Sequence, residues 1–549
     1  MRIIIGTSIA LVLAAAAVEA QISIPPDVRL TEIASGDVLT APPVNARDVV
    51  LAHLDGDGHL DLFVAAGGVG AFSDQVNALY WGHGDATFTR DVSGQDIVTD
   101  LDDSRGIAVG DFDLDGDIDV YVANSKEGQN ALYLNQLGQG SPRVFTRVSG
   151  DPSTLDTKNA RQAVAADVDG DGDLDLYVTN WNGQTNDLFL NTTAGTGGGS
   201  LFVKATALQA GAAVTDGGFS FGATFGDIDG DDDLDLFVAN HSGLPQEVGN
   251  PPTGAPNALY LNDGSGLFTP VRGVPPVLDV RNSLGCAFGD HDGDGDLDLF
   301  VGNVQYQTNR LFENDGSGGF TQVQDIAALV DRAHTIDVQW ADLNLDGRLE
   351  LLLANRAGLP FQQKDTLYYY RGGQLVRQGF GPLGKSTTLS GDTYAYAVGD
   401  LDGDTLPDLV GVNFDSAPWV FRNDATMWNS VASLSAGGPE LSAEGYLLKD
   451  QATGLRLTGA TPHRPAGLLA QLGSTTPNPT PFGGITLLTS PVGQLLFVTN
   501  TDGTGGIEVS TTLDVDLLSD FGMLFQWIVL DSETPYALSS SNGLTVVTP

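Results

Sequence analysis

An acidic nine-residue loop recurs along this chain at intervals of 52 to 63 residues. The clearest copy, Asp167–Asp175, reads Asp-Val-Asp-Gly-Asp-Gly-Asp-Leu-Asp. The seven copies begin at His53, Asp111, Asp167, Asp227, Asp290, Asp342 and Asp400. A fixed period of this order is typical of propellers and solenoids, because a single repeat cannot bury its apolar face alone and must stack on its neighbours. The period therefore limits the chain to a repeat architecture.

The spacing of the acids within each loop predicts calcium binding. Calcium prefers six to eight oxygen ligands. Aspartates at positions 1, 3 and 5 of a tight loop can converge on one centre, and a backbone carbonyl at position 7 and the acid at position 9 can complete the shell. Glycine at position 6 permits the sharp turn, since it accepts a positive φ. The predicted ligands, loop by loop, are Asp55, Asp57 and Asp61; Asp111, Asp113, Asp115, Asp117 and Asp119; Asp167, Asp169, Asp171, Asp173 and Asp175; Asp227, Asp229, Asp231, Asp233 and Asp235; Asp290, Asp292, Asp294, Asp296 and Asp298; Asp342, Asn344, Asp346, Arg348 and Glu350; and Asp400, Asp402, Asp404, Leu406 and Asp408.

The seven copies are not equivalent. The first has His53 where the first aspartate belongs, and the fourth and seventh have Asp232 and Thr405 at the glycine position. The sixth places Arg348 beside the ion. We therefore expect up to seven calcium ions, bound most tightly by the middle loops and more weakly by the first, sixth and seventh. The alternatives are that these are only solvated acidic turns, or that calcium has a purely structural role.

Each repeat also shows the alternation of apolar and polar residues that indicates β-strands. In the second repeat, strands are expected at 106–110, 119–124, 130–135 and 144–148. Four short antiparallel strands per repeat make a propeller blade. The seventh repeat lacks a fourth strand, whereas an additional strand-like segment occurs at Val28–Ile33. This segment is expected to complete the last blade, which predicts an all-β, seven-bladed propeller over residues 27–425.

The two ends of the chain differ from the repeats. Residues 1–20 have the basic start, apolar run and small-residue end of a secretory signal peptide. Residues 430–549 are predicted to form a smaller β-sandwich-like domain. No later segment is apolar and long enough to span a membrane. The protein is therefore expected to be secreted, or held non-covalently at a cell surface, and monomeric. Its formal charge of −45 argues against nucleic acid as a partner.

The repeats resemble the FG-GAP/VCBS family, which forms the integrin α-chain propeller and occurs in many bacterial secreted proteins. The resemblance rests on the acidic loops, on the segment that follows them (Leu234–Asn240, Leu-Asp-Leu-Phe-Val-Ala-Asn) and on the Asn-Ala-Leu-Tyr-Leu-Asn frame (Asn257–Asn262). It covers about 400 residues. It implies a calcium-binding propeller in a secreted bacterial protein, with partners bound on the face opposite the calcium loops.

Candidate ligand-binding residues lie on that opposite face. Its loops carry Phe72, Lys126, Trp181, His241, Tyr306, Arg356, Phe361 and Phe414. In addition, Arg47, Arg105 and Arg161 each lie six residues before a calcium loop, at the entrance to the innermost strand, where the later blades have Phe221, Leu284, Ile336 and Tyr394. Arginine suits bidentate capture of carboxylate or sulfate. The alternative is that these arginines bond to neighbouring carbonyls or acids.

These features favour an extracellular binding or adhesion module for a glycan or a protein. No catalytic grouping of the seven histidines with serine or acid stands out, so an enzyme is not indicated. Two alternatives remain open: a calcium-dependent lyase acting on acidic polysaccharide, and a purely structural component of a surface or matrix.

Overall fold

The computed structural model describes residues 30–33 and most of 45–423, and ten strands after residue 423. Within 45–423 the residues that it does not describe are 69–73, 138, 141–142, 193–199, 244–253, 306, 325–328, 330–333, 346, 357–364, 372–373, 378–392 and 415–416. The chain divides into two compact units, Pro26–Thr426 and the remaining residues. The predicted signal peptide lies outside the described residues.

The larger unit consists of seven four-stranded antiparallel sheets, which confirms the predicted all-β, seven-bladed propeller. Blades 1 to 3 are β2 (Ala46–Ala52), β3 (Asp61–Ala66), β5 (Ala78–Gly82) and β6 (Phe88–Arg90); β8 (Ser104–Gly110), β9 (Asp119–Asn124), β10 (Ala131–Asn135) and β11 (Phe145–Arg147); and β12 (Ala160–Ala166), β13 (Asp175–Asn180), β15 (Asp187–Asn191) and β16 (Phe202–Lys204). Blades 4 to 6 are β18 (Ser220–Gly226), β19 (Asp235–Asn240), β21 (Ala258–Leu261) and β22 (Thr269–Pro270); β24 (Ser283–Gly289), β25 (Asp298–Asn303), β26 (Arg310–Asn314) and β27 (Phe320–Gln322); and β28 (Thr335–Ala341), β29 (Glu350–Asn355), β30 (Thr366–Arg371) and β31 (Gln374–Arg377). Blade 7 is β32 (Thr393–Gly399), β33 (Asp408–Asn413), β34 (Trp419–Asn423) and β1 (Leu30–Glu32).

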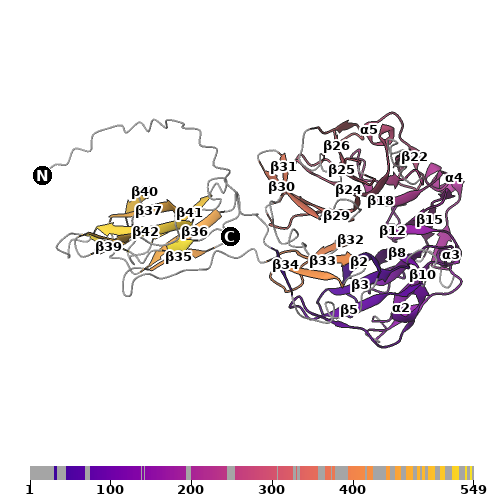
Figure 1. Ribbon diagram of the computed structural model, residues 1–549, viewed down its shortest axis with the longest axis horizontal. Helices are drawn as coiled ribbons and strands as arrows, with labels where there is room; N and C mark the ends of the chain where they lie inside the picture. Colours follow the sequence, from indigo (N-terminus) through magenta and orange to yellow (C-terminus); the bar gives the residue numbers. More distant parts are fainter. Residues whose placement is uncertain are drawn as a thin grey trace. The chain divides into compact units, whose positions relative to one another are not determined.

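The ring closes through the N-terminal strand. β1 pairs antiparallel with β34, with Leu30 opposite Asn423 and Glu32 opposite Phe421. The segment predicted at Val28–Ile33 therefore supplies the missing strand of the last blade. The first strands of successive blades contact one another around the whole ring, including β32 with β2, and Figure 1 shows the blades arranged around this centre.

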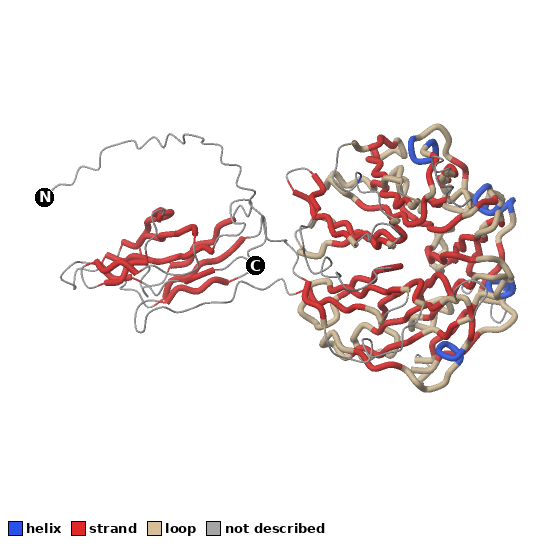
Figure 2. Tube along the Cα trace, in the orientation of Figure 1, coloured by secondary structure: helices blue, strands red, loops and turns tan. Residues whose placement is uncertain are grey.

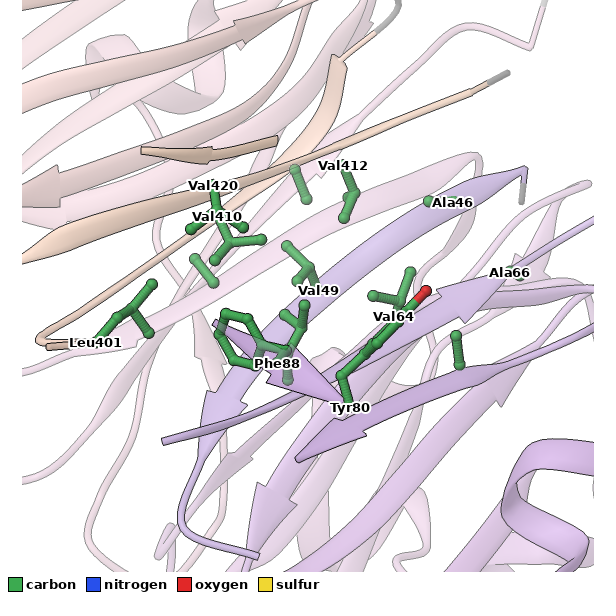
Figure 3. Packing of buried hydrophobic residues seen from close by; sticks show 14 of the residues in the cluster. Ala46, Val49, Val64, Ala66, Tyr80, Phe88, Leu401, Val410, Val412 and Val420 are labelled. Carbon is green, nitrogen blue, oxygen red and sulfur yellow. The ribbon is translucent and has the colours of Figure 1, made fainter. Parts of the chain in front are cut away.

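Apolar clusters between adjacent blades hold the ring together. One cluster joins the last blade to the first and includes Val49, Val64, Tyr80, Val410 and Val412, all buried (Figure 3). This packing follows from the sequence, because strands buried on both faces read as continuous apolar runs such as Asp-Leu-Phe-Val-Ala-Asn. The last and first blades are thus joined by side-chain packing, and Leu30 of β1 packs separately with Trp419 and Phe421 of β34.

Short helices and two-stranded ribbons connect the blades, and Figure 2 shows the helices at the outer rim of the propeller. The helices are α2 (Asp96–Thr99), α3 (Pro152–Leu155), α4 (Ala207–Ala210), α5 (Pro275–Leu278) and the 3₁₀ turn η2 (Ala212–Val214). The ribbons pair β4 (Gln75–Val76) with β7 (Leu101–Asp102), β14 (Gln184–Thr185) with β17 (Gly217–Gly218) and β20 (Ala255–Pro256) with β23 (Val280–Arg281). No helix among the described residues is both long and apolar enough to cross a membrane.

After residue 423 the described elements are all strands. A three-stranded sheet contains β35 (Glu440–Glu444), β36 (Ala452–Thr458) and β41 (Ile507–Thr512). A second sheet contains β40 (Gly493–Asn500), β37 (Pro465–Gly473), β42 (Gly522–Leu530), β43 (Leu538–Ser540) and β44 (Leu544–Val546), and β38 (Pro479–Phe482) pairs with β39 (Ile485–Leu488).

Candidate functional site

The acidic loops join the first and second strands of each blade. The acid at position 9 of a loop accepts hydrogen bonds from the start of the loop and from the third strand of the blade. In blade 3, Asp175 Oδ2 accepts a hydrogen bond from the backbone N–H of Val168 at 2.9 Å, and Oδ1 accepts one from Asn191 on the third strand at 2.7 Å. The same pair of bonds is made by Asp61, Asp119, Asp235, Asp298 and Asp408. The position-9 acid therefore orders the loop whether or not it also binds an ion.

Asparagines at the end of the third strand link five of the seven loops to the neighbouring blade, a role that the sequence analysis missed. Asn191 Nδ2 donates to the carbonyl of Phe112, inside the loop of blade 2, at 2.9 Å, and to Leu174 O at 3.2 Å. Equivalent bonds to the loop of an adjacent blade are made by Asn135, Asn262, Asn314 and Asn423. The signal was present in the sequence as the closing asparagine of the repeated Asn-x-Leu-x-x-Asn frame. Loops 1, 2, 3, 4 and 6 are thus held by their own blade and by the next.

Loops 2, 3 and 4 have the features expected of a cation site. Their position-3 acids, Asp113, Asp169 and Asp229, each have a buried Oδ1 with no hydrogen-bond partner. In loops 3 and 4 the carboxylate oxygens at positions 1, 3 and 9 come within 4.8 Å of one another, and in loop 2 those at positions 1, 3 and 5 do so. Burial, and then the neighbouring Asp115, raise the pKa of Asp113 to about 6. A buried carboxylate oxygen without a donor is costly, and a hard cation would compensate it. The residues present in these loops therefore fit calcium.

The irregular residues of loops 4 and 7 occupy the strained position that the sequence predicts for them. Asp232 and Thr405, which replace glycine, have φ values of 71° and 77°. Side chains with a β-carbon rarely adopt such angles, and aspartate tolerates them better than threonine, which is β-branched. Loop 7 is therefore the more strained of the two.

Loop 1 does not fit a calcium ion, because an arginine occupies its position-3 acid. Arg143, from the hairpin between β10 and β11, places Nη2 2.7 Å and Nε 2.8 Å from Asp55 Oδ2. The guanidinium also lies over the Trp81 ring, 5.0 Å from its centre. Position 1 is His53, whose Nδ1 lies 2.9 Å from the carbonyl of His59, the position-7 residue. A fixed positive charge thus stands where loops 2 to 4 leave a carboxylate oxygen unpaired.

Loops 5, 6 and 7 are intermediate. In loop 5, the His291 ring Nδ1 lies 2.6 Å from Asp298 Oδ2, although the acids at positions 1, 3 and 5 are all present. In loop 6, Asn344 donates to Glu350 at 3.3 Å, and Asp346 lies outside the described residues. In loop 7, Arg422 Nε lies 3.8 Å from Asp402, the position-3 acid. The predicted ranking of the loops stays a prediction, which the unpaired oxygens of loops 2 to 4 favour.

A pocket of about 230 Å³ lies at the other end of the innermost strands, and we call it the channel-mouth pocket. It brings together residues that the sequence places far apart. The pocket is lined by all seven residues that lie six positions before an acidic loop, and by Asp48, Gln162, Trp181, Gly222, Asp337, Arg356 and Ala395. Of the six residues predicted to bind a ligand, Arg47, Arg105, Arg161, Trp181 and Arg356 therefore share one pocket, and Tyr306 lies outside the described residues.

The three arginines of blades 1 to 3 differ in their partners. Arg105 forms an ion pair with Asp103 at 2.8 Å, as the alternative interpretation of these arginines predicts. Arg47 lies 4.5 Å above the Tyr394 ring and 4.6 Å above Phe414, with one long contact to the Gly68 carbonyl at 3.4 Å. Arg161 lies 5.0 Å above Trp181 and, within the described part of the chain, makes no ion pair. The Nε of each of the three is buried without a hydrogen-bond partner.

This crowding of cations has an electrostatic consequence. Burial and then the nearby charges of Arg105 and Arg47 lower the pKa of Arg161 to about 9. Burial also lowers the pKa of Arg47, which is only 8% exposed. The cations on the outer part of the same face are instead paired with carboxylates, among them Arg147 with Asp100 and Lys158 with Asp187. Among the described residues, Arg47 and Arg161 of the channel-mouth pocket are thus buried cations without an ion pair.

The other loop residues singled out in the sequence have mainly structural contacts. Lys126 lies 3.7 Å from Asp103, and His241 packs 5.2 Å from Trp181. Burial lowers the pKa of His241 to about 4. Phe414 stacks on Tyr394, while Phe72 and Phe361 lie outside the described residues.

Asp48, Asp337 and three glycines each follow by one residue the positions that lie six residues before an acidic loop, and we call this level the floor of the channel-mouth pocket. Asp48 accepts from the N–H of Ile107 in blade 2, and Asp337 accepts from Tyr396 in blade 7. Burial and the charge of Asp337 raise the pKa of Asp48 to about 7. The glycines at the equivalent level, Gly106, Gly222 and Gly285, have the backbone of the next inner strand so close that a β-carbon would lie 2.2 to 2.7 Å from it. Adjacent inner strands thus approach each other closely at this level.

The fold and its loops define a seven-bladed propeller built from acidic-loop repeats, and comparison with known proteins assigns its family. The family model of the FG-GAP-like repeat matches residues 53–122, 111–178, 167–238, 248–301 and 290–353, which together span more than half of the chain. The chain therefore belongs to the FG-GAP-like repeat family.

Among curated proteins, the chain is similar to cartilage acidic protein 1. It is 25% identical to the Xenopus tropicalis protein over 394 residues (67% of this chain and 53% of the relative), and 25% identical to the Homo sapiens protein over 56% of this chain and 48% of the relative. The chain thus matches only about half the length of these relatives. Among solved structures, it is similar to an Agrocybe aegerita lectin that recognises non-reducing terminal N-acetylglucosamine (TM-score 0.41, 15% identity, 68% of this chain and 87% of that chain) and to the Dos1 propeller (TM-score 0.42, 8% identity, 72% and 95%).

Proposed function

We propose that this protein is a secreted, calcium-stabilised binding module that holds an acidic glycan or protein ligand at the channel-mouth pocket. The observation that carries this proposal is the uncompensated charge of Arg47 and Arg161. Buried guanidinium groups without a carboxylate partner are costly, and an incoming oxyanion would supply that partner. The aromatic rings beneath the guanidiniums support them from one side and leave their N–H edges for a ligand.

Calcium would act as a scaffold on the opposite face. Loops 2 to 4, with their unpaired position-3 oxygens, are the best candidates, and the acids at positions 1, 3, 5 and 9 would hold the ion together with the position-7 carbonyl. Bound calcium would neutralise the acidic loops and stabilise the turns that begin each second strand. Because the asparagines link loop to loop, ordering one loop would also support its neighbour. Millimolar extracellular calcium would suffice for sites of this exposed kind.

The test is retention of the calcium-loaded protein on immobilised acidic and neutral macromolecules. Polygalacturonate, chondroitin sulfate and poly-glutamate would be compared with dextran, and the eluate would be analysed for new chain ends. We expect retention on acidic matrices that decreases with salt, and loss of retention in Arg161→Gln. Arg147→Ala is the matched control, because Arg147 is paired with Asp100 at the rim. Equal retention of Arg161→Gln and wild type would overturn the proposed site.

The same experiment separates the two alternatives. A lyase acting on acidic polysaccharide predicts release of unsaturated chain ends, whereas a structural component predicts self-association without retention. Both carboxylates on the floor of the pocket, Asp48 and Asp337, already accept backbone hydrogen bonds on each of their oxygens. These bonds give both acids a structural role and favour the binding module over the lyase.

A further inference from the structure

The channel-mouth pocket has two chemically different halves. Its walls at the seven equivalent positions run in chain order from Arg47, Arg105 and Arg161 in blades 1 to 3, through three apolar side chains in blades 4 to 6, to Tyr394 in blade 7. The apolar side chains are Phe221, Leu284 and Ile336. Because consecutive blades are neighbours in the ring, the cations gather on one side and the apolar side chains on another. At these seven positions a ligand therefore meets charge on one edge and hydrocarbon on the other, and Asp337 and Arg356 of blade 6 are the charged lining residues nearest the apolar side.

This division bears on the class of ligand. A strongly hydrated acidic sugar gains little from Leu284 and Ile336, which offer neither hydrogen bonds nor an aromatic face. The aromatic faces nearest the cations are already covered by guanidinium groups, since Arg161 lies over Trp181 and Arg47 lies over Tyr394 and Phe414. Burying an apolar group against Phe221, Leu284 and Ile336 would instead be favourable in proportion to the area removed from water.

The volume of the channel-mouth pocket also limits the size of the ligand. The pocket volume of about 230 Å³ lies below the roughly 300–1,000 Å³ usual for drug-sized ligands. By its volume, the pocket therefore suits one ring-sized group better than a segment in the middle of a polymer.

From these features we propose that the channel-mouth pocket binds a carboxylate attached to a ring-sized apolar body. The carboxylate would lie between Arg161 and Arg47, and the apolar body would lie against Phe221, Leu284 and Ile336. Such a group occurs in a free aromatic or branched aliphatic acid, and also at a protein C-terminus that ends in an apolar residue. The inference rests on the proposed function, since it requires the same arginines to bind an anion.

Calorimetric titration of the calcium-loaded protein with three probes of equal charge tests the inference. Phenylacetate carries the apolar body, glucuronate carries a hydroxylated ring, and N-acetyl-glycyl-phenylalanine presents the group as a chain end. We expect one of the two apolar probes to bind at least tenfold more tightly than glucuronate. Binding of the peptide but not of phenylacetate would identify the source as a protein C-terminus, and binding of phenylacetate would identify a free acid.

Variants on the two halves make the outcomes distinguishable. Arg161→Gln should weaken every anion at least tenfold, whereas Leu284→Gln should weaken only the apolar probes and remove their advantage over glucuronate. Arg147→Ala should change nothing, and the thermal midpoint of each variant reports whether it folds. If Leu284→Gln fails to fold, Ile336→Thr replaces it. Glucuronate binding as tightly as both apolar probes would overturn this inference and leave the proposed anion site intact, while no binding of any acid would overturn both.

Discussion

Replacing Arg143 with alanine is expected to destabilise the propeller by about 2 kcal/mol in calcium-free buffer. Asp55 is 3% exposed at its side chain and Arg143 is 48% exposed, so their pair is intermediate between two measured classes. Breaking a fully buried pair costs roughly 3–5 kcal/mol, and an exposed pair contributes roughly 0.2–1 kcal/mol. We take about 1–1.5 kcal/mol for the ion pair on this scale, and about 0.5–1 kcal/mol for the guanidinium above Trp81.

The same residue tests whether an arginine replaces calcium in loop 1. His53→Asp together with Arg143→Ala restores the position-1 acid and removes the competing cation. The double variant should bind one calcium ion more than wild type, because loop 1 then has the acids of loop 3. Bound calcium would be counted by equilibrium dialysis and atomic emission, and unfolding would be followed in urea with and without EGTA. Arg147→Ala is the matched control, since it removes an ion pair from the same hairpin without touching a loop.

Two results would refute this reasoning. If wild type and the double variant bind the same number of ions, loop 1 either already holds calcium beside Arg143 or cannot hold it at all. If Arg143→Ala unfolds at the same urea concentration as wild type, the contact with Asp55 contributes nothing to stability. The comparison depends on a difference of one ion, so it is independent of how many of loops 5 to 7 are occupied.

Three further predictions concern calcium, the asparagine links and pH. Asp169→Asn should reduce the stabilisation that calcium gives by about 2 kcal/mol, close to the value for one site at a hundredfold excess over Kd. Asp57→Asn in loop 1 should leave that stabilisation unchanged. Thermal midpoints with and without EGTA measure the effect of calcium on both variants. Asn191→Ala should lower the free energy of unfolding, measured in urea, by about 2–3 kcal/mol. The reason is that the carbonyls of Phe112 and Leu174 lose the side chain that donates to them. A loss below about 0.5 kcal/mol would contradict an inter-blade role. Burial raises the folded-state pKa of Asp48 to about 7, so the contribution of this group to stability is present at pH 4 and is lost as the pH rises through 7. At saturating calcium, the thermal midpoint should therefore fall less between pH 5 and pH 8 in Asp48→Asn than in wild type.

The sequence by itself determined the fold and its repeat unit. Each loop carries its ligands within nine consecutive residues, so their convergence is a local property of the turn. The repeat period set the number of blades, and the lone strand before the first repeat indicated how the ring closes. Repeat symmetry also placed Arg47, Arg105 and Arg161 at equivalent positions, which is why their meeting at one mouth of the channel could be predicted from the sequence alone.

Only the tertiary structure decided which of these charged and polar side chains have an ion-pair or hydrogen-bond partner. Arg143 lies 88 residues from Asp55, and Asn191 lies 79 residues from Phe112, so nothing in the spacing of a single repeat relates them. Their contacts exist because ring closure brings the third strand and outer hairpin of one blade against the loop of the next. In the same way, the sequence could not show that Arg105 is paired with Asp103 while Arg161 makes no ion pair with any residue that the structure describes. The pairing of a charge depends on what the neighbouring blades place beside it, and that is settled by packing and not by sequence spacing.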